Sequence, residues 1–236
     1  MKDKSQLASP SSASCSTTQE VTQFLRKVAH TPAATSARGR LVFAMDATAS
    51  RQPTWDRTCQ WQGDMFEAAA TVGGLAVQLL WYRGYGEFQA EPWLTASSEL
   101  QRRMSSVQCR GGLTQISRVL EHTVRETKQH RVNALVLVAD FLEETIDPLC
   151  HQAGQLGVLG VPAFVFQEGN DPDAARGFRE IARLTRGAYC AFDGNSARQL
   201  RELLAAVAVY ATGGRPALEQ FSQRHGGLIQ QLTRQL

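Results

Sequence analysis

Two apolar runs that each end in an aspartate constrain the fold of this chain most strongly. Residues 41–45 are all apolar and lead to Asp46, and the mostly apolar run at 132–139 leads to Asp140. A strand that is apolar on every side has to be covered on both faces, which favours the parallel sheet of an α/β protein. Ligands of such sheets bind beyond the carboxyl ends of the strands. Both aspartates are therefore expected at a binding edge.

Strand-like and helix-like segments alternate along the chain. Further strands are expected at 75–82, 87–93, 161–166 and 188–192. Helices are expected at 53–72, 97–107, 114–130, from 147 onward, at 171–185 and at 196–211. This alternation predicts a doubly wound, Rossmann-like α/β domain with a mostly parallel six-stranded sheet and helices on both faces. Gly84 and Gly86 mark a turn, so the strand at 87–93 is expected antiparallel at one sheet edge.

The chain is expected to divide into four parts: a disordered tail at 1–16, an N-terminal helix with a linker at 17–39, the α/β domain at 40–212 and a helical extension at 213–236. The tail is small and polar, and such a composition buries too little apolar surface to offset its ordering entropy. Thr17 and Glu20 have the spacing of a capping box at the start of the N-terminal helix.

Composition narrows the class of protein. The net charge of +3 comes from scattered Lys and Arg, which gives little indication of nucleic-acid binding. The five cysteines are widely spread and include no CxxC pair, so they are expected as reduced thiols in a cytoplasmic protein, and structural zinc is not expected. The N-terminal stretch has no continuous apolar run, so neither a signal peptide nor a membrane span is expected.

Side chains with oxygen ligands follow both apolar runs and a glycine-rich loop. Thr48 and Ser50 occupy alternate positions after Asp46, and Thr114 follows Gly111-Gly112. These groups and Asp140 converge if the first and fourth strands are neighbours and the strand order reverses between them. Carboxylate and hydroxyl oxygens suit Mg²⁺ or Mn²⁺ far better than Zn²⁺. The sequence therefore predicts a site for a hard divalent cation.

Each of these residues also has an ordinary structural alternative when it is taken alone. The alternatives are a helix cap for Asp46, turn positions for Thr48 and Ser50, the N-cap of the following helix for Thr114, and an ion pair with an arginine for Asp140. Only as a set do the five residues favour a metal site, because convergence constrains them together.

In this order and spacing the residues resemble the von Willebrand factor A family, in the form that carries a metal-ion-dependent adhesion site. The family pattern is D-x-S-x-S, then a Thr in a later glycine-rich loop, then an Asp at the end of the fourth strand. The resemblance covers about residues 40–212 and implies a fold of this type. It assigns the metal ligands to Asp46, Thr48, Ser50, Thr114 and Asp140. Thr48 stands where the family has Ser, and Phe141 stands where Gly commonly follows the last Asp.

The resemblance implies binding of a partner protein without covalent chemistry. Mg²⁺ prefers a full shell of oxygens, and the site leaves a position that an Asp or Glu of the partner can fill. Intracellular members of the family act as adaptors or assembly components, with AAA+ ATPases among their partners. We therefore expect a non-catalytic cytoplasmic module that contacts no membrane.

Two other functions stay open. A Rossmann-like metal-dependent phosphotransferase or phosphatase also begins with an Asp after the first strand, but it needs a second Asp where Thr48 stands. A nucleic-acid-binding protein or nuclease would need more carboxylates around its ions. A scaffold with a vestigial metal site is a further alternative.

Charged residues near the site have alternatives as well. Glu143 and Glu144 are expected in an exposed acidic loop, with contact to the ion as the other interpretation. Arg51 and Arg57 are expected either to select an acidic partner or to be solvated surface residues.

Overall fold

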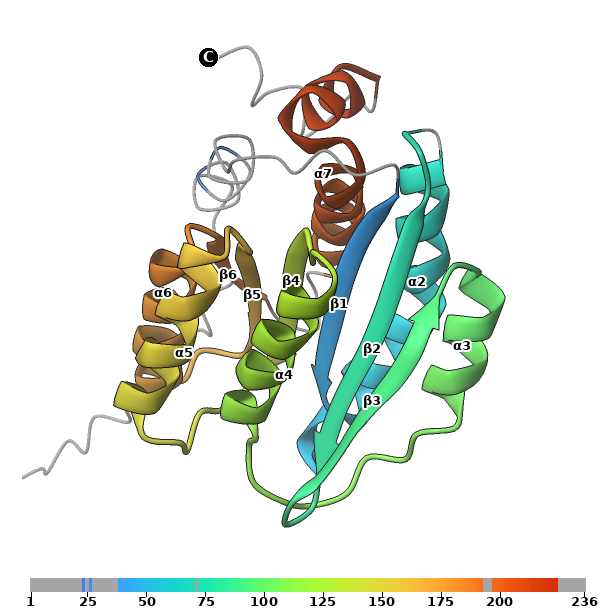
Figure 1. Cartoon of the computed structure of the whole chain (residues 1–236). Coiled ribbons are helices and arrows are strands. Elements are labelled where there is room, and N and C mark those ends of the chain that lie inside the picture. Colours follow the sequence, from blue (N-terminus) through green and yellow to red (C-terminus); the bar gives the residue numbers. More distant parts are fainter. Residues whose placement is uncertain (1–22, 24–25, 27–37, 71, 193–196, 225–236) are drawn as a thin grey trace, which may run out of the picture.

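The sheet has the predicted doubly wound topology. The computed structural model describes residues 23, 26, 38–70, 72–192 and 197–224. In this part of the chain the strands are β1 (Gly39–Asp46), β2 (Leu75–Arg83), β3 (Glu87–Leu94), β4 (Ala134–Ala139), β5 (Ala163–Glu168) and β6 (Ala188–Phe192). They form one six-stranded sheet in the order β3-β2-β1-β4-β5-β6 (Figure 1). All neighbouring pairs are parallel except β2 and β3, so β3 is the antiparallel edge strand that the sequence predicts.

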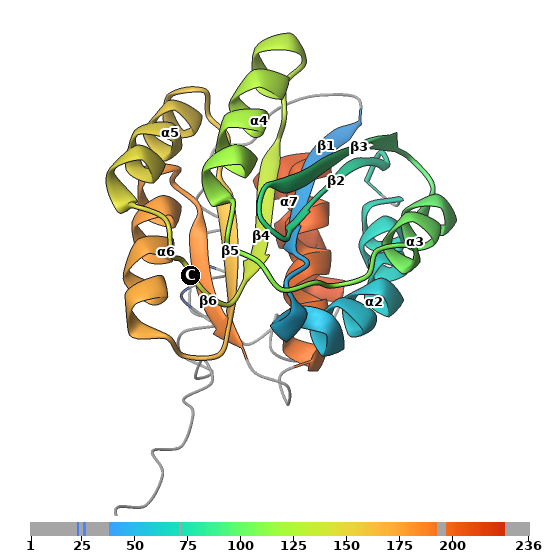
Figure 2. The ribbon, with the colours of Figure 1, turned by 90° about the horizontal axis from the view of Figure 1, so that it is seen from below.

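Helices cover both faces of the sheet (Figures 1 and 2). They are the 3-10 turn η1 (Ala49–Arg51) and the helices α2 (Gln52–Ala70), α3 (Ser97–Ser105), α4 (Ile116–Gln129), α5 (Ile146–Val158), α6 (Pro172–Leu184) and α7 (Ala197–Arg224). One core cluster joins α2, α3 and α7 to the sheet, and the other joins α4, α5 and α6 to its opposite face.

The apolar run of β1 explains why the sheet needs two covered faces. Leu41, Phe43 and Met45 belong to one core cluster, and Val42 and Ala44 belong to the other. All five side chains are fully buried. Burial of one large aliphatic or aromatic side chain contributes about 1.5–3 kcal/mol, so β1 would lose much of its stabilisation if either layer of helices were missing.

The strand order reverses between β1 and β4. These two strands are parallel neighbours, and Met45 pairs with Val138 one position before the two strand ends. The chain leaves β1 toward α2 on one face and leaves β4 toward α5 on the other. The carboxyl ends of β1 and β4 therefore flank the topological switch point, where ligands of open α/β sheets bind. Figure 2 views this edge of the molecule.

The ends of the chain are described only in part. The predicted tail at 1–16 lies outside the described residues, as does the predicted helix at 17–39 except for residues 23, 26, 38 and 39. The helix expected to end near residue 211 continues as α7 to Arg224, with a kink at Gly214, where φ is 65°. Beyond the kink, Leu218 is buried and Phe221 packs against the core. None of the described helices has the length and apolar character needed to cross a membrane.

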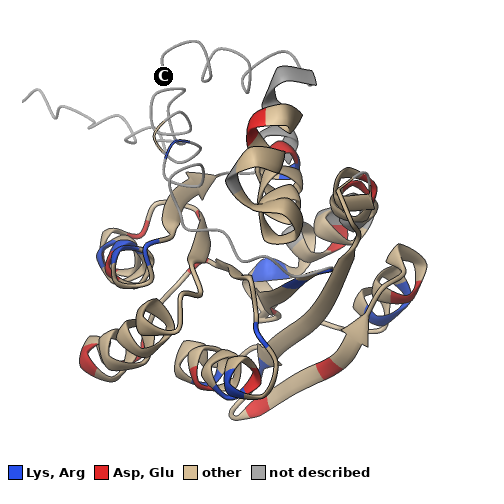
Figure 3. Cartoon of the chain, turned by 45° about the horizontal axis from the view of Figure 1, so that its top comes forward, with Lys and Arg blue, Asp and Glu red and all other residues tan. Residues whose placement is uncertain are grey.

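Charged residues of both signs occur on the same helices (Figure 3). Glu180 and Arg183 form an ion pair one turn apart on α6, and Glu99 and Arg102 do the same on α3. Ion pairs this exposed contribute little to stability, because water and salt screen them. Their main effect is to place a carboxylate beside these arginines.

Candidate metal centre

Three loops from distant parts of the sequence meet at the switch point. The amide of Arg110, in the α3–α4 loop, donates to the carbonyl of Ala47 over 3.0 Å. The amide of Leu113 in the same loop donates to the carbonyl of Gly84 at the β2–β3 turn, over 3.2 Å. The loop after β4 reaches the same place because Asp140 contacts Ser50. The carboxyl edge of the sheet thus gathers the segments that hold all five predicted ligands.

Four of the five predicted ligands form one hydrogen-bonded chain. The amide of Thr48 donates to Oδ1 of Asp46 over 2.7 Å. The hydroxyl oxygens of Thr48 and Ser50 lie 3.3 Å apart. The hydroxyl of Ser50 donates to Oδ2 of Asp140 over 2.7 Å. Asp46 and Thr48 are buried, whereas Ser50 is exposed and Asp140 is half-buried. Solvent therefore reaches these hydrogen-bonded residues from the side of Ser50.

Thr114 joins this group through the loop after β4. Its amide donates to Oε2 of Glu143 over 3.1 Å, and its hydroxyl accepts the amide of Glu143 over 3.3 Å. Glu143 lies three residues after Asp140. Among the described residues, no direct hydrogen bond connects Thr114 with the other four. The interpretation of Thr114 as the N-cap of α4 is wrong, because Gln115 occupies that position.

The two glutamates after β4 bind the segment that begins α4. The carboxylate of Glu144 accepts the amides of Ile116 and Ser117, the latter over 2.8 Å. These amides are among the four that a helix start leaves unpaired, and a carboxylate there also interacts favourably with the helix dipole. Glu143 is exposed, as expected, but its carboxylate is engaged by Thr114. Sequence reasoning missed this role because nothing local links residue 144 to residue 116.

Asp46 has one carboxylate oxygen without a partner. Its side chain is 1% exposed, and Oδ2 is buried with no hydrogen bond among the described residues. Burial raises the pKa of Asp46 to about 6, against the hydrogen bonds from Thr48, and Asp140 adds a smaller repulsion. The phenol of Tyr82, which pairs with Asp46 across β1 and β2, is also buried without a hydrogen bond. A cation would satisfy the free oxygen of Asp46 and reduce the cost of its charge.

The donor set fits a hard cation and not a soft one. Two carboxylates and three hydroxyls suit Mg²⁺ or Mn²⁺, which prefer oxygen. Within the described part of the chain, no three His, Cys, Asp or Glu side chains come together in a way that holds a metal ion. The hydroxyl oxygens of Thr48, Ser50 and Thr114 therefore have to serve as ligands alongside the two carboxylates.

Phe141 does not prevent the turn after β4. Its amide donates to Oδ1 of Asp140 over 3.0 Å. In the described residues, Arg186 is the one non-glycine residue with a positive φ, so the backbone at Phe141 turns outside the left-handed region. The family's usual Gly is therefore not required at this position.

Arg51 is a functional candidate that sequence reasoning placed wrongly. The interpretation of Arg51 as a surface residue fails, because it is completely buried and forms an ion pair with Glu168 at the end of β5. Burial lowers the pKa of Arg51, and attraction to Asp140 and Asp46 opposes this effect. No local sequence signal indicates the burial, since the partner lies on another strand. The side chain of Arg57 lies outside the described part of the structure.

Three exposed apolar side chains belong to loops near the candidate centre. Tyr85 is 90% exposed at the β2–β3 turn, Leu113 is 52% exposed in the α3–α4 loop and Phe141 is 51% exposed after β4. Each belongs to a loop at the carboxyl edge of the sheet (Figure 2). We call these three residues the apolar rim.

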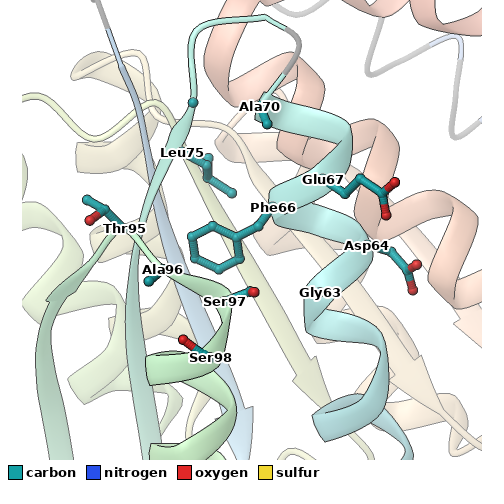
Figure 4. Close-up of a pocket in the computed structure, with 11 residues that line it drawn as sticks. Gly63, Asp64, Phe66, Glu67, Ala70, Leu75, Thr95, Ala96, Ser97 and Ser98 are labelled. Carbon is teal, nitrogen blue, oxygen red and sulfur yellow. The ribbon is translucent and has the colours of Figure 1, made fainter.

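A separate cleft lies at the opposite edge of the sheet, between α2 and the start of α3 (Figure 4). Its volume is about 660 Å³, and Phe66 points into it toward Ser97. Asp64, which also lines the cleft, is already paired with Arg201 over 2.7 Å. The cleft and Asp46 lie at opposite ends of the strands. Leu75, which lines the cleft, is the first residue of β2, whereas Asp46 is the last residue of the parallel strand β1.

The fold matches that of solved von Willebrand factor A structures. The chain is similar to a von Willebrand factor type A protein from Catenulispora acidiphila, with a TM-score of 0.57 and 19% identity over 75% of this chain and 44% of that one. Proximal thread matrix protein 1 from the mussel byssus, in a structure with a zinc-occupied MIDAS motif, gives a TM-score of 0.57 and 14% identity over 75% of this chain and 47% of that one.

A shorter neighbour is covered almost completely. An aerotolerance-related membrane protein from Bacteroides fragilis has a TM-score of 0.54 and 15% identity, over 70% of this chain and 96% of that one. The sequence matches no protein-family model and no curated protein sequence. Identities this low establish the fold alone. The molecule has a doubly wound α/β fold of the von Willebrand factor A type, and the matched region spans less than half of two of these relatives.

Proposed function

We propose that this chain binds a partner protein through a divalent ion, Mg²⁺ or Mn²⁺, held by Asp46, Thr48, Ser50, Thr114 and Asp140. The observation that carries the proposal is the buried, unpaired Oδ2 of Asp46 at the end of the hydrogen-bonded chain that leads to Asp140. When bound, the ion supplies an electrophilic position for an oxygen ligand. A carboxylate from an Asp or Glu of the partner is the ligand that best fits that position.

The accessibility of the site supports an external ligand. Ser50 is exposed, and Asp140 is half-buried beside it, whereas the remaining ligands lie below the surface. An incoming carboxylate can therefore reach the ion from the side of Ser50 and Asp140. Tyr85, Leu113 and Phe141 would then contact the residues that flank the partner's acidic side chain, which adds apolar burial to the single polar contact.

The proposed module is not an enzyme. Position 48 carries a hydroxyl in place of the carboxylate that a Rossmann-like phosphatase uses as its general acid. The carboxylates of Glu143 and Glu144 already accept backbone amides, which leaves them poorly placed to activate a water. Likeness to the family extends the proposal to a cytoplasmic adaptor or assembly component, with an AAA+ ATPase as a partner to be tested.

Metal-dependent capture tests the proposal. The full chain is immobilised and exposed to an extract of the source cells in Mg²⁺ and then in EDTA, and calorimetry measures Mg²⁺ binding directly. We expect Mg²⁺ to bind and a discrete partner to be retained only while Mg²⁺ is present. The proposal fails if the same proteins are retained equally with the chelator.

Two variants serve as matched controls for that experiment. Asp46→Asn keeps the acceptor for the amide of Thr48 but removes the charge, so both Mg²⁺ binding and capture should be lost. Asp173→Asn removes a carboxylate that is exposed on α6 and should change neither. Hydrolysis of a generic phosphomonoester by the wild-type chain, abolished in Asp46→Asn, would instead support the phosphatase alternative.

A further inference from the structure

A buried arginine lies beside the proposed metal site without supplying a ligand. Arg51 follows Ser50 directly, and its side chain is 1% exposed. The amide of Arg51 donates to the carbonyl of Thr48 over 3.0 Å, which ties its backbone to the loop that carries three of the ligands. Its guanidinium pairs with Glu168 and lies 6.0 Å from the ring centre of Phe192. The charge is therefore fixed in place by packing as well as by its ion pair.

Arg51 offsets one of the two negative charges that Asp46 and Asp140 bring to the site. Asp46 and Asp140 supply two negative charges, and the buried guanidinium of Arg51 supplies one positive charge. Glu168 adds a negative charge, but its side chain is 22% exposed, so water screens it more than it screens Arg51. A divalent ion entering this site meets a fixed cation that solvent cannot screen, and the repulsion is strong in a buried environment.

We propose that Arg51 keeps the affinity of the site for free divalent ions low, so that the ion and the partner's carboxylate bind together. This inference rests on the proposed function. The incoming carboxylate restores the negative charge that Arg51 offsets, and it is itself attracted by the guanidinium. Because coupling between two ligands is reciprocal, the partner strengthens metal binding by the same factor that the metal strengthens partner binding.

The arrangement thus favours the complex of chain, ion and partner over the chain with the ion alone. A site with two carboxylates and no nearby cation would hold the ion before the partner arrives. Here the free chain is expected to bind its ion weakly and to release it readily, and an acidic side chain raises the fraction of metal-bound chain at a given metal concentration. Arg51 acts through the electrostatic field and is a positioning residue rather than a ligand.

Titration with Mn²⁺ alone tests the inference without a known partner. Electron paramagnetic resonance measures the concentration of free Mn²⁺ in the presence of the wild-type full chain, of Arg51→Met or of Glu168→Gln. We expect Arg51→Met to bind Mn²⁺ about tenfold more tightly or better, because it removes the buried positive charge. Glu168→Gln should bind about threefold more weakly or worse, because Arg51 then loses its compensating charge. The exposed matched control Arg176→Met, on α6, should stay within about twofold of wild type, since solvent screens its charge.

A carboxylate added from solution tests the coupling. Sodium acetate replaces sodium chloride at constant ionic strength, with free Mn²⁺ corrected for acetate complexes. The difference in Mn²⁺ affinity between wild type and Arg51→Met should narrow, because a bound acetate offsets the guanidinium. Circular dichroism and thermal unfolding confirm that each variant is folded.

Opposite shifts in the two variants separate electrostatics from damage to the fold. The inference is overturned if folded Arg51→Met binds Mn²⁺ no more tightly than wild type, or if both variants weaken binding alike. In either case the proposed function survives, provided that wild type binds Mn²⁺ and Asp46→Asn does not. Absence of Mn²⁺ binding in every variant, Arg51→Met included, overturns the proposed function together with the inference.

Discussion

Folding changes the protonation of Asp46 in a pH range that is easily reached in experiments. Its pKa rises from 3.8 to about 6, chiefly because of burial. Between about pH 4 and 6 the folded carboxyl keeps a proton that the unfolded chain has released. The free energy of unfolding therefore falls as the pH rises through this window, and the full cost applies above about pH 6. A shift of about two pH units corresponds to about 3 kcal/mol in the metal-free protein.

Asp46→Asn should remove this cost. In EDTA at neutral pH, we expect the variant to be more stable than wild type by about 1–3 kcal/mol, and the difference should shrink as the pH falls toward about 4. Addition of Mg²⁺ should reverse the order, because only the wild-type carboxylate gains a cation. Urea denaturation at several pH values, with and without Mg²⁺, measures both effects. If the difference in stability between the variant and wild type is the same at neutral and at acid pH, the assigned burial cost is contradicted.

The start of α4 shows what a local pattern can and cannot predict about an element. The apolar spacing at 114–130 predicts the helix, and the structure confirms it as Ile116–Gln129. The cap could not be predicted, because it comes from Glu144, whose carboxylate is brought to Ile116 by the crossover from β4. Local propensity reports on residues within a few positions of a helix end, whereas this partner is set by the tertiary fold.

Removal of that carboxylate should loosen the start of α4. Glu144→Ala is expected to lower the free energy of unfolding by about 1–2 kcal/mol, because two backbone amides lose their acceptor and the dipole loses its charge. Glu144→Gln keeps an acceptor and should cost about half as much. Glu121→Ala, at an exposed position of the same helix, should change stability by less than about 0.5 kcal/mol. Urea denaturation compares the three, and equal losses in all would show that the cap has no special role.

The α3–α4 loop depends on a close approach that only glycine permits. A Cβ on Gly112 would overlap the backbone of Gly84, whereas one on Gly111 would meet nothing within 4 Å. We expect Gly112→Ala to destabilise the fold by about 2 kcal/mol or more and to weaken Mg²⁺ binding, because the loop that carries Thr114 has to shift. Gly111→Ala is the matched control and should be nearly neutral. Similar behaviour of the two variants in urea denaturation and calorimetry would contradict this packing.

At the scale of the whole molecule, topology accounts for the part of the site that could be predicted. Apolar runs that end at Asp46 and Asp140 indicate two parallel strands, and the predicted ligands converge if these strands are neighbours at the point where the strand order reverses. The structure meets that condition, because β1 and β4 are neighbours. The ion pair of Arg51 with Glu168 could not be predicted, because it joins η1, which follows β1, to the end of β5, two strands away in the sheet. Charges whose partners are set by strand order carry no local signature.

If a divalent ion binds where the three loops meet, its effect on the molecule should be confined to them. In hydrogen–deuterium exchange, Mg²⁺ should slow the amides of residues 46–52, 110–116 and 139–146 relative to EDTA, because the ion links segments whose local opening otherwise occurs independently. Amides of α6 and of α7 beyond Leu200 should exchange at unchanged rates, since neither helix carries a predicted ligand. The same experiment on Asp46→Asn should show no change with Mg²⁺. Protection limited to one loop would mean that the ion does not join the three segments, and uniform protection would point to global stabilisation by an ion bound elsewhere.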